Sequence, residues 1–344
     1  MAVSDPPIAE GVTDVREISR IAYGFIASKA LFTALDLGLF RCLSVPLTLA
    51  ELADCTGVDI GRLRTLTSSL IALRLLIREG ERYANAPAVS RYLIPGAPAY
   101  FGDYYRLQVA RQIYPALMHL EAGVRGDVSD LAHQSIEAML SDPAEAEAFT
   151  RAQHAGSTGP ALLLARRFDL GEPLNLLDVA GGSGAFSIAL CNRYPHLKAT
   201  IIDFPTVVAS AGQFVAEARL ETRISLIAGN AFKVDWPHQQ DVVLMSYLLS
   251  AVAEADIDGL VERAYSALRP GGLLLVHDFM LDDDRSGPLQ ASLWFLQYLA
   301  YQQGVVSLTQ AELDRRLSKH GFTVERGEAL VPGITRLVVC RRRS

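Results

Sequence analysis

Residues 174–184 read Leu-Asn-Leu-Leu-Asp-Val-Ala-Gly-Gly-Ser-Gly, and this stretch decides the fold. A short apolar run of strand length passes into a glycine-rich turn, after which residues 185–193 have helical character. Glycines at such a turn let the backbone approach a ligand closely and enter the helix sharply. A strand–turn–helix unit of this kind suits a dinucleotide, a phosphate or a nucleoside, and it equally suits a tight turn without a ligand.

The alternation of strand and helix continues from this unit to the C-terminus. Further strands are expected at 199–203, 224–228, 241–247, 273–278, 323–329 and 335–341, and helices lie between most of them and at 289–301 and 309–319. Regular alternation of this kind predicts a mostly parallel sheet with helices on both faces, which is an α/β fold of the Rossmann-like type.

The N-terminal part of the chain lacks this alternation. Apolar residues recur at helical spacing over 15–39 and over 59–76. Thr48 and Glu51 form a capping-box pattern that starts a short helix between these two segments. Residues 76–83 predict a hairpin, so the whole pattern indicates a mainly helical winged-helix domain.

Length and charge divide the chain and limit its partners. The 344 residues exceed one ordinary core, so we expect a winged-helix-like domain at 1–100 and a second domain at 101–344. Residues 101–172 are expected to form a helical linker that also walls a pocket. The net charge of −6 argues against a nucleic-acid partner, since phosphate neutralisation needs a basic surface. We therefore expect the apolar helical domain to mediate dimerisation.

The cysteines and the apolar segments suggest a cytoplasmic protein. Cys42, Cys55, Cys191 and Cys340 are scattered without CxxC pairing, which predicts reduced thiols and neither a disulfide framework nor a zinc site. The first twenty residues lack an apolar signal core, and no apolar run has the length of a membrane span.

Residues at the strand ends are the first candidates for ligand binding, because α/β sheets bind ligands beyond the carboxyl ends of their strands. The first strand carries Asp178 ahead of its glycines, and the second ends in Asp203, where a carboxylate is able to accept both hydroxyls of a ribose. The third is followed by Asn230 and Phe232, an amide for an adenine edge and an aromatic ring for its face. The alternatives are a helix cap for Asp203 and core packing for Phe232.

Taken together, these pieces resemble a known family. Residues 15–343 resemble the bacterial and plant small-molecule O-methyltransferases that have a winged-helix dimerisation domain. The resemblance rests on Asp-Val-Ala-Gly-Gly-Ser-Gly at 178–184, Ile-Ile-Asp-Phe-Pro at 201–205, Gly-Asn-Ala-Phe at 229–232 and Leu-Arg-Pro-Gly-Gly at 268–272. It implies a seven-stranded sheet whose last strand inserts antiparallel, an intertwined homodimer, S-adenosylmethionine as methyl donor and a hydroxylated aromatic metabolite as acceptor.

The resemblance also implies roles for residues at matching positions. Asn230 stands where the family more often has an aspartate, and Ser246 stands where many members have a lysine or arginine that touches the donor. The donor-binding set implied in this way is Asp178, Gly181, Gly182, Gly184, Asp203, Asn230, Phe232 and Ser246.

The sequence departs from the family pattern at the catalytic base. Many members have a histidine after the fourth strand, followed by Asp-Trp, that deprotonates a phenol, whereas this chain has Ser250 there. A serine hydroxyl is no general base near neutral pH without help from another group. Orientation alone can lower the barrier by about 7 kcal/mol, so methyl transfer remains feasible. The acceptor atom therefore stays open between a phenolic oxygen and an aromatic carbon or nitrogen.

Other residues are candidates for the missing base and for the substrate pocket. His277 beside Asp278 at the end of the fifth strand, or His154 on the helix before the first strand, is a possible substitute. The alternatives are a polar pair at a strand end for His277 and Asp278 and a partly exposed helix histidine for His154. A metal role for His277 and Asp278 also stays open, but no further histidine has helpful spacing, so no resident metal is expected. A flat aromatic acceptor would suit walls formed by Trp294, Phe295, Tyr298 and Tyr301 with Tyr104 and Tyr105, although core packing explains single members equally well.

These observations predict a homodimeric S-adenosylmethionine-dependent methyltransferase that acts on a small aromatic specialised metabolite, without nucleic-acid or membrane partners. Two rivals are a donor-binding member that no longer methylates and a winged-helix regulator that senses a metabolite. A third, a nicotinamide-dependent oxidoreductase, lacks a second βαβ half with its own catalytic residues.

Overall fold

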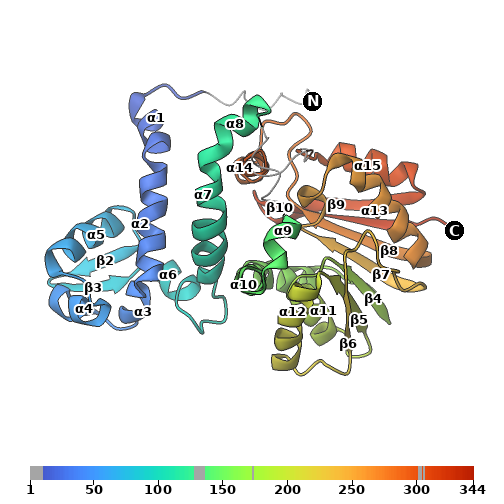
Figure 1. The fold of residues 1–344 in the computed structure, drawn as a ribbon, viewed down its shortest axis with the longest axis horizontal. Helices are drawn as coiled ribbons and strands as arrows, with labels where there is room; N and C mark the ends of the chain where they lie inside the picture. Colours follow the sequence, from blue (N-terminus) through green and yellow to red (C-terminus); the bar gives the residue numbers. More distant parts are fainter. Residues whose placement is uncertain (1–10, 128–135, 173, 301–303, 305–306) are drawn as a thin grey trace, which may run out of the picture. The chain divides into compact units, whose positions relative to one another are not determined.

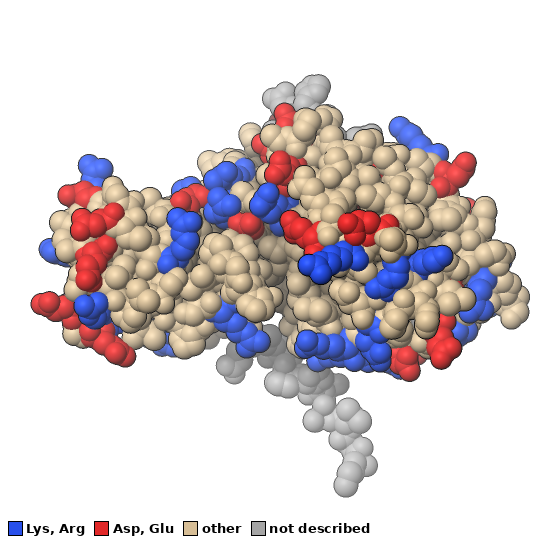
Figure 2. Space-filling model, turned by 90° about the horizontal axis from the view of Figure 1, so that it is seen from below, with Lys and Arg blue, Asp and Glu red and all other residues tan. Residues whose placement is uncertain are grey.

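The computed structural model describes residues 11–127, 136–172, 174–300, 304 and 307–344. The chain forms two compact units, Met1–Gly102 and Asp103–Ser344 (Figure 1). Figure 2 shows acidic and basic side chains interspersed over the face that it displays. None of the described helices has the length and apolar character needed to cross a lipid bilayer.

The first unit combines helices with a small antiparallel sheet. Its helices are α1 (Val15–Ala22), α2 (Gly24–Asp36), α3 (Leu39–Cys42), α4 (Leu49–Thr56), α5 (Ile60–Ala72) and α6 (Pro87–Tyr92), and its strands are β1 (Leu47–Thr48), β2 (Leu76–Glu79) and β3 (Arg82–Asn85). The strands pair in the order β1-β3-β2, which includes the predicted hairpin. The Thr48 hydroxyl accepts the Glu51 amide and Glu51 bonds back to the Thr48 amide, so the predicted capping box is present.

The long helix predicted over 15–39 is divided in two. Tyr23 separates α1 from α2, and the next residue is Gly24, a poor helix former. The chain then leaves α2 at Asp36, and Gly38 takes a left-handed conformation (φ 64°). Apolar spacing continues through both breaks, so periodicity alone does not reveal them.

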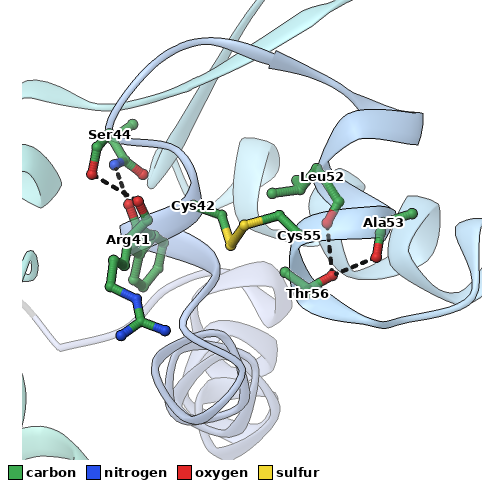
Figure 3. The surroundings of a disulfide bond; sticks show 9 residues. Arg41, Cys42, Ser44, Leu52, Ala53, Cys55 and Thr56 are labelled. Atoms are coloured by element: carbon green, nitrogen blue, oxygen red, sulfur yellow. Dashed lines mark hydrogen bonds between the residues drawn. A yellow bond between two sulfur atoms is a disulfide. The ribbon is translucent and has the colours of Figure 1, made fainter.

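A disulfide joins α3 to α4 in this unit, which corrects the prediction of four reduced thiols. Cys42 and Cys55 are bonded with their Cα atoms 6.2 Å apart (Figure 3), while Cys191 and Cys340 are free and buried. The chain returns through β1 between α3 and α4, and this turn brings together two cysteines separated by 13 residues. No short cysteine motif signals such a pairing.

The second unit is built on a seven-stranded sheet. Its strands are β4 (Asn175–Val179), β5 (Lys198–Asp203), β6 (Ile224–Ala228), β7 (Gln240–Ser246), β8 (Leu268–Asp278), β9 (Phe322–Val331) and β10 (Thr335–Arg342). They are ordered β6-β5-β4-β7-β8-β10-β9. The last strand lies between β8 and β9 and is antiparallel to both, as predicted. β8 begins five residues before the predicted start, because the Leu-Arg-Pro-Gly-Gly segment is itself extended.

Helical segments accompany this sheet. They are η1 (Tyr104–Ile113, π-helical), α7 (Tyr114–Ala116), η2 (Leu117–His119), α8 (Leu120–Arg125), α9 (Ile136–Ser141), α10 (Pro143–Arg167), α11 (Ala185–Arg193), α12 (Pro205–Glu217), η4 (Leu249–Ala251), α13 (Glu254–Ala267), α14 (Leu289–Tyr298) and α15 (Gln310–Lys319). Asp142 caps α10, because its side chain accepts the backbone amides of Ala144 and Glu145. The predicted pocket residue Tyr301 lies outside the described residues.

Two apolar cores cover the two faces of the sheet. Leu176 packs with residues of α10 and α11, whereas the next residue, Leu177, packs with residues of α13 and α15. Figure 1 shows these helix pairs on opposite sides of the strands. Because successive strand residues point to opposite faces, each strand contributes side chains to both layers. The parallel strands β4 to β8 end at one common edge of the sheet.

Candidate functional site

The carboxyl ends of the two central parallel strands have left-handed backbones. Ala180 after β4 has φ 54° and Tyr247 after β7 has φ 56°. These strands are neighbours in the sheet. Left-handed conformations of residues other than glycine cost about 1–3 kcal/mol and concentrate at functional sites. The strain therefore marks the edge at which such sheets bind ligands.

The glycine-rich turn leaves no room for side chains at two positions. A Cβ on Gly181 would lie 2.7 Å from the Asp178 side-chain carbon, and one on Gly184 would lie 2.7 Å from Ile201 Cδ1. Gly184 also has φ 77° and serves as the N-cap of α11. Glycine at these positions thus lets the backbone turn tightly from β4 into α11. The N-terminus of α11 then lies close to the end of β4, and a helix N-terminus suits a polar or anionic ligand group.

Two buried carboxylates support this turn. The Ser187 hydroxyl donates to Asp178 at 2.6 Å, and the Gly182 amide donates to Asp203 at 2.8 Å. The Phe204 amide also donates to Asp203, at 2.7 Å. Burial raises the pKa of each carboxyl to about 6 despite these hydrogen bonds. Both groups are therefore mostly ionised at neutral pH but protonate in mild acid.

The predicted adenine-binding residues follow β6. The Asn230 side-chain oxygen accepts the Phe232 amide at 2.9 Å, so it caps a local turn. Phe232 is 38% exposed, which excludes it from the core. The Gly229 amide donates to the Asp203 carbonyl at 2.8 Å and fixes this segment beside β5. Asn230, Phe232 and Asp203 therefore belong to one neighbourhood at the sheet edge.

His154 of α10 lies against the glycine-rich turn. Its Nδ1 is 2.9 Å from the Ser183 hydroxyl oxygen, and its ring stacks on Phe214 of α12 with centroids 4.0 Å apart. Burial lowers the pKa of His154 to about 4, so its imidazole is neutral at physiological pH. The sequence did not single out Ser183 or Phe214, because only the packing of α10 against α11 and α12 brings them together.

His277 is enclosed between two hydroxyl groups. Its Nδ1 lies 2.9 Å from Ser246 Oγ, and its Nε2 lies 2.9 Å from Thr335 Oγ1 at the start of β10. The side chain is 0% exposed, and burial lowers the pKa of His277 to about 3. Both ring nitrogens are thus engaged by protein groups, and the imidazole is neutral.

Asp278 holds the segment that contains Ser250. The Ser250 amide donates to Asp278 Oδ2 at 3.0 Å, and the Phe279 amide donates to Oδ1 at 2.8 Å. Burial raises the pKa of Asp278 to about 6, although these hydrogen bonds favour its charged form. Ser250 itself is fully buried within η4. The predicted pair of His277 and Asp278 therefore divides between two separate hydrogen-bond networks.

Aromatic rings form a continuous wall next to these groups. Phe279 lies 5.4 Å from the Tyr247 ring and stacks on Trp294 at 4.4 Å with an interplanar angle of 18°. Tyr298 meets Trp294 edge-on at 6.1 Å. The Tyr104 phenol interacts electrostatically with the phenols of Tyr298 and Tyr247, and burial raises the pKa of Tyr104. The structure thus brings the predicted residues Trp294, Tyr298 and Tyr104 together around the end of β8.

Polar groups without partners occur on the same wall. Within the part of the chain that the structure describes, the buried Trp294 Nε1 and both amide atoms of Gln297 have no hydrogen-bond partner. Trp294 and Gln297 are three residues apart on α14, so they share one side of the helix. Unpaired buried polar atoms are costly, and a ligand that pairs with them is stabilised accordingly. Helical position alone did not distinguish Gln297 from an ordinary surface residue.

Metal coordination is not favoured by the described side chains. No group of three or more His, Cys, Asp or Glu residues among them is placed to hold a metal ion.

Comparisons with known proteins agree with this architecture. The chain matches the O-methyltransferase domain family over residues 122–323 and the O-methyltransferase dimerisation domain over residues 19–95. It is 32% identical over 284 residues to the 3-hydroxy-5-methyl-1-naphthoate 3-O-methyltransferase of Streptomyces sahachiroi, with 82% of each chain covered. It is also 31% identical over 329 residues to the tetracenomycin polyketide synthesis 8-O-methyl transferase TcmO of Streptomyces glaucescens, covering 95% of this chain and 96% of TcmO.

A solved structure supports the same assignment. Human N-acetylserotonin methyltransferase, crystallised with S-adenosylmethionine, matches the fold with a TM-score of 0.84 at 27% identity, and the match covers 100% of both chains. The glycine-rich turn, the acidic residue that ends β5 and the inserted strand β10 are all present in this chain. The chain therefore belongs to the O-methyltransferase family with an N-terminal dimerisation domain, and it is an enzyme that uses S-adenosylmethionine as its methyl donor.

Proposed function

We propose that this enzyme methylates a small, flat aromatic metabolite of specialised metabolism, with a phenolic oxygen as the acceptor. The observation that carries the proposal is the stacked wall of Tyr247, Phe279, Trp294 and Tyr298 at the end of β8. Aromatic rings favour offset-stacked and edge-on partners, so a planar acceptor gains both contact area and orientation there. Two relatives are named for O-methylation of a naphthoate and of a polyketide in tetracenomycin synthesis.

The donor is assigned to the opposite part of the sheet edge. Asp178 and the glycines at 181, 182 and 184 would cradle its methionine part, while the Asp203 carboxylate would accept its ribose hydroxyls. Asn230 and the half-exposed Phe232 would bind the adenine edge and face. Ser246, at the end of β7 between the two halves of the site, would touch the donor from the acceptor side.

Catalysis would rest mainly on placement. Methyl transfer is an in-line displacement in which the acceptor lone pair forms a bond to the methyl carbon while the carbon–sulfur bond breaks. Neutral His154 lies on the donor side, and Ser250 and His277 are buried behind the sheet edge. A carbon or nitrogen acceptor remains the second candidate, because Ser250 occupies the position of the family's usual histidine and such an acceptor makes a different demand on a base than a phenol does.

The first domain, residues 1–100, is proposed to hold two copies of the chain together. Val15, Ile18, Ile21 and Phe25 recur at helical spacing along α1 and the start of α2, and all of them are exposed. An apolar stripe of this kind is typical of a surface that another chain covers. A cytoplasmic location is proposed as well, since the methyl donor is a cytoplasmic metabolite.

The test of this function is methyl transfer itself. The enzyme would be incubated with donor carrying a labelled methyl group and a panel of phenols, aromatic amino acids and N-heteroaromatics. Mass spectrometry is expected to detect label on a polycyclic or bicyclic phenol, and NMR of the product would identify the methylated atom. Donor binding by calorimetry without label on any acceptor would favour a family member that no longer methylates. An acceptor labelled on carbon or nitrogen would favour the second candidate.

A further inference from the structure

Ser246, His277 and Thr335 form a polar unit within an otherwise apolar part of the sheet. His277 bridges the two hydroxyls at 2.9 Å on each side. The Phe186 ring lies 5.3 Å away, and the Tyr247 ring stands edge-on at 4.6 Å with an interplanar angle of 69°. Buried polar groups of this sort are no more stable than apolar residues of equal size, so their arrangement requires a reason beyond packing.

The neutral imidazole gives this unit a fixed geometry. A neutral histidine carries one N–H donor and one acceptor nitrogen, so it bonds the Ser246 and Thr335 hydroxyls with opposite polarity. Ser246 of β7 is paired with His277 of β8. Thr335 is the first residue of β10, which pairs with β8 on the side away from β7. Three strands therefore fix one hydrogen-bonded row, and neither hydroxyl is free to turn without losing its partner.

The two ends of the row reach different halves of the site. Val179 pairs with Met245, so Ala180 and Ser246 lie side by side at the entrance to the glycine-rich turn. At the other end, the Tyr247 ring stands edge-on to the imidazole at 4.6 Å, and its phenol interacts with the Thr335 hydroxyl. The Tyr247 ring in turn contacts Phe279 of the aromatic wall. His277 is thus placed between the donor half and the acceptor half.

We propose that His277 is a positioning residue that holds the Ser246 hydroxyl toward the methyl donor and, through Thr335, sets the Tyr247 ring against the acceptor. This inference rests on the proposed function, because it assigns the acceptor to the wall that Tyr247 begins. It distinguishes His277 from a general base, since both ring nitrogens are already engaged by Ser246 and Thr335.

Two matched variants separate the ends of the row. The amide of His277→Asn is expected to reach the place of Nδ1 and keep the bond to Ser246, whereas that of His277→Gln is expected to reach the place of Nε2 and keep the bond to Thr335. Loss of one such hydrogen bond corresponds to about a tenfold change in a binding constant. H277Q is therefore expected to raise the donor KM and the calorimetric donor Kd about tenfold. H277N is expected to leave both within about twofold, while it lowers kcat and raises the acceptor KM.

Smaller changes keep the proposal testable if these variants fold poorly. Thr335→Val removes only the hydroxyl and should reproduce the H277N kinetics, while Ser246→Ala should reproduce H277Q. Combining S246A with H277Q should add little to either single change, because both act through one hydrogen bond. The pH profile of kcat/KM should keep the same acid limb in wild type and H277N, since the imidazole does not exchange protons with the acceptor.

The proposal would be overturned if H277N and H277Q both changed the donor KM and the acceptor KM to the same extent. Loss of the acid limb from the kcat/KM profile of H277N would also overturn it. The donor calorimetry is independent of turnover. Should no acceptor be methylated by the wild type, the proposed function fails, yet unequal donor Kd values for H277Q and H277N would still support the Ser246 half of the inference.

Discussion

At the scale of single residues, the site depends on carboxylates that are buried before any ligand arrives. Asp203 accepts amides from Gly182 and from Phe204, and burial raises its pKa to about 6. A ribose hydroxyl donates to the ionised carboxylate, so donor binding favours the deprotonated form. The pKa of Asp203 should therefore fall when the donor binds.

This linkage predicts a pH-dependent donor affinity. The donor Kd should be constant above about pH 7 and should rise as the pH falls through about 6, approaching a tenfold change per unit. Asp203→Asn should weaken donor binding by about tenfold or more and flatten this dependence. Calorimetry between pH 5 and 8 measures both effects. A wild-type affinity that stays constant over this range would exclude Asp203 as the ribose ligand.

The glycine at position 181 gives a second prediction at this scale. In Gly181→Ala the new methyl group would lie 2.7 Å from the Asp178 side-chain carbon, so the carboxylate must leave Ser187 or the turn must shift. Donor affinity should fall about tenfold or more, because either movement displaces the amides of the turn. Gly259→Ala is the matched control: this exposed glycine lies in α13 with nothing near its Cβ position. G259A should leave donor affinity unchanged and raise Tm slightly. Equal donor affinities in the two variants would contradict the account of the turn.

At the scale of elements, local sequence signals identified the glycine-rich turn, the hairpin and the capping box. These features depend on residues within a few positions of one another, so spacing is enough to reveal them. The surroundings of His277 were not predictable, because Thr335 reaches it only through the insertion of β10 beside β8. The break between α1 and α2 at Tyr23 is not predictable from periodicity either, because the apolar spacing continues through it.

The link between α3 and α4 carries a prediction for the first unit. Oxidised, denatured protein should titrate two free thiols, those of Cys191 and Cys340, and reduced protein should titrate four. A disulfide that closes so short a loop stabilises the folded protein by about 3 kcal/mol relative to the unfolded chain, so a reductant should lower the Tm of oxidised protein. The double variant Cys42→Ser, Cys55→Ser should show no response to reductant. Protein isolated under reducing conditions should begin in the four-thiol state, because the reductant cleaves the disulfide. Four thiols in protein treated with an oxidant would contradict the pairing.

At the scale of the whole molecule, an acidic chain carries an uncovered apolar stripe in its first unit. The net charge is −6, and acidic and basic side chains are interspersed on the face shown in Figure 2. Mixed charge of this kind keeps a protein soluble without providing a basic surface for nucleic acid. The stripe along α1 and α2 is apolar and exposed, and we propose that a second copy of the chain packs against it.

The oligomeric state tests this proposal directly. Wild-type protein should have about twice the 37.4-kDa mass of one chain by light scattering coupled to size exclusion. Ile21, 75% exposed in α1, lies within the stripe, and Ile21→Lys should shift the population toward the single-chain mass because it would bury an unpaired charge. Leu174→Lys is the matched control: Leu174 is 56% exposed but precedes β4, at the end of the sheet opposite the site. L174K should keep the wild-type mass. A dimer that survives I21K unchanged, with donor affinity intact in both variants, would show that α1 lies outside the interface and that another surface joins the two copies.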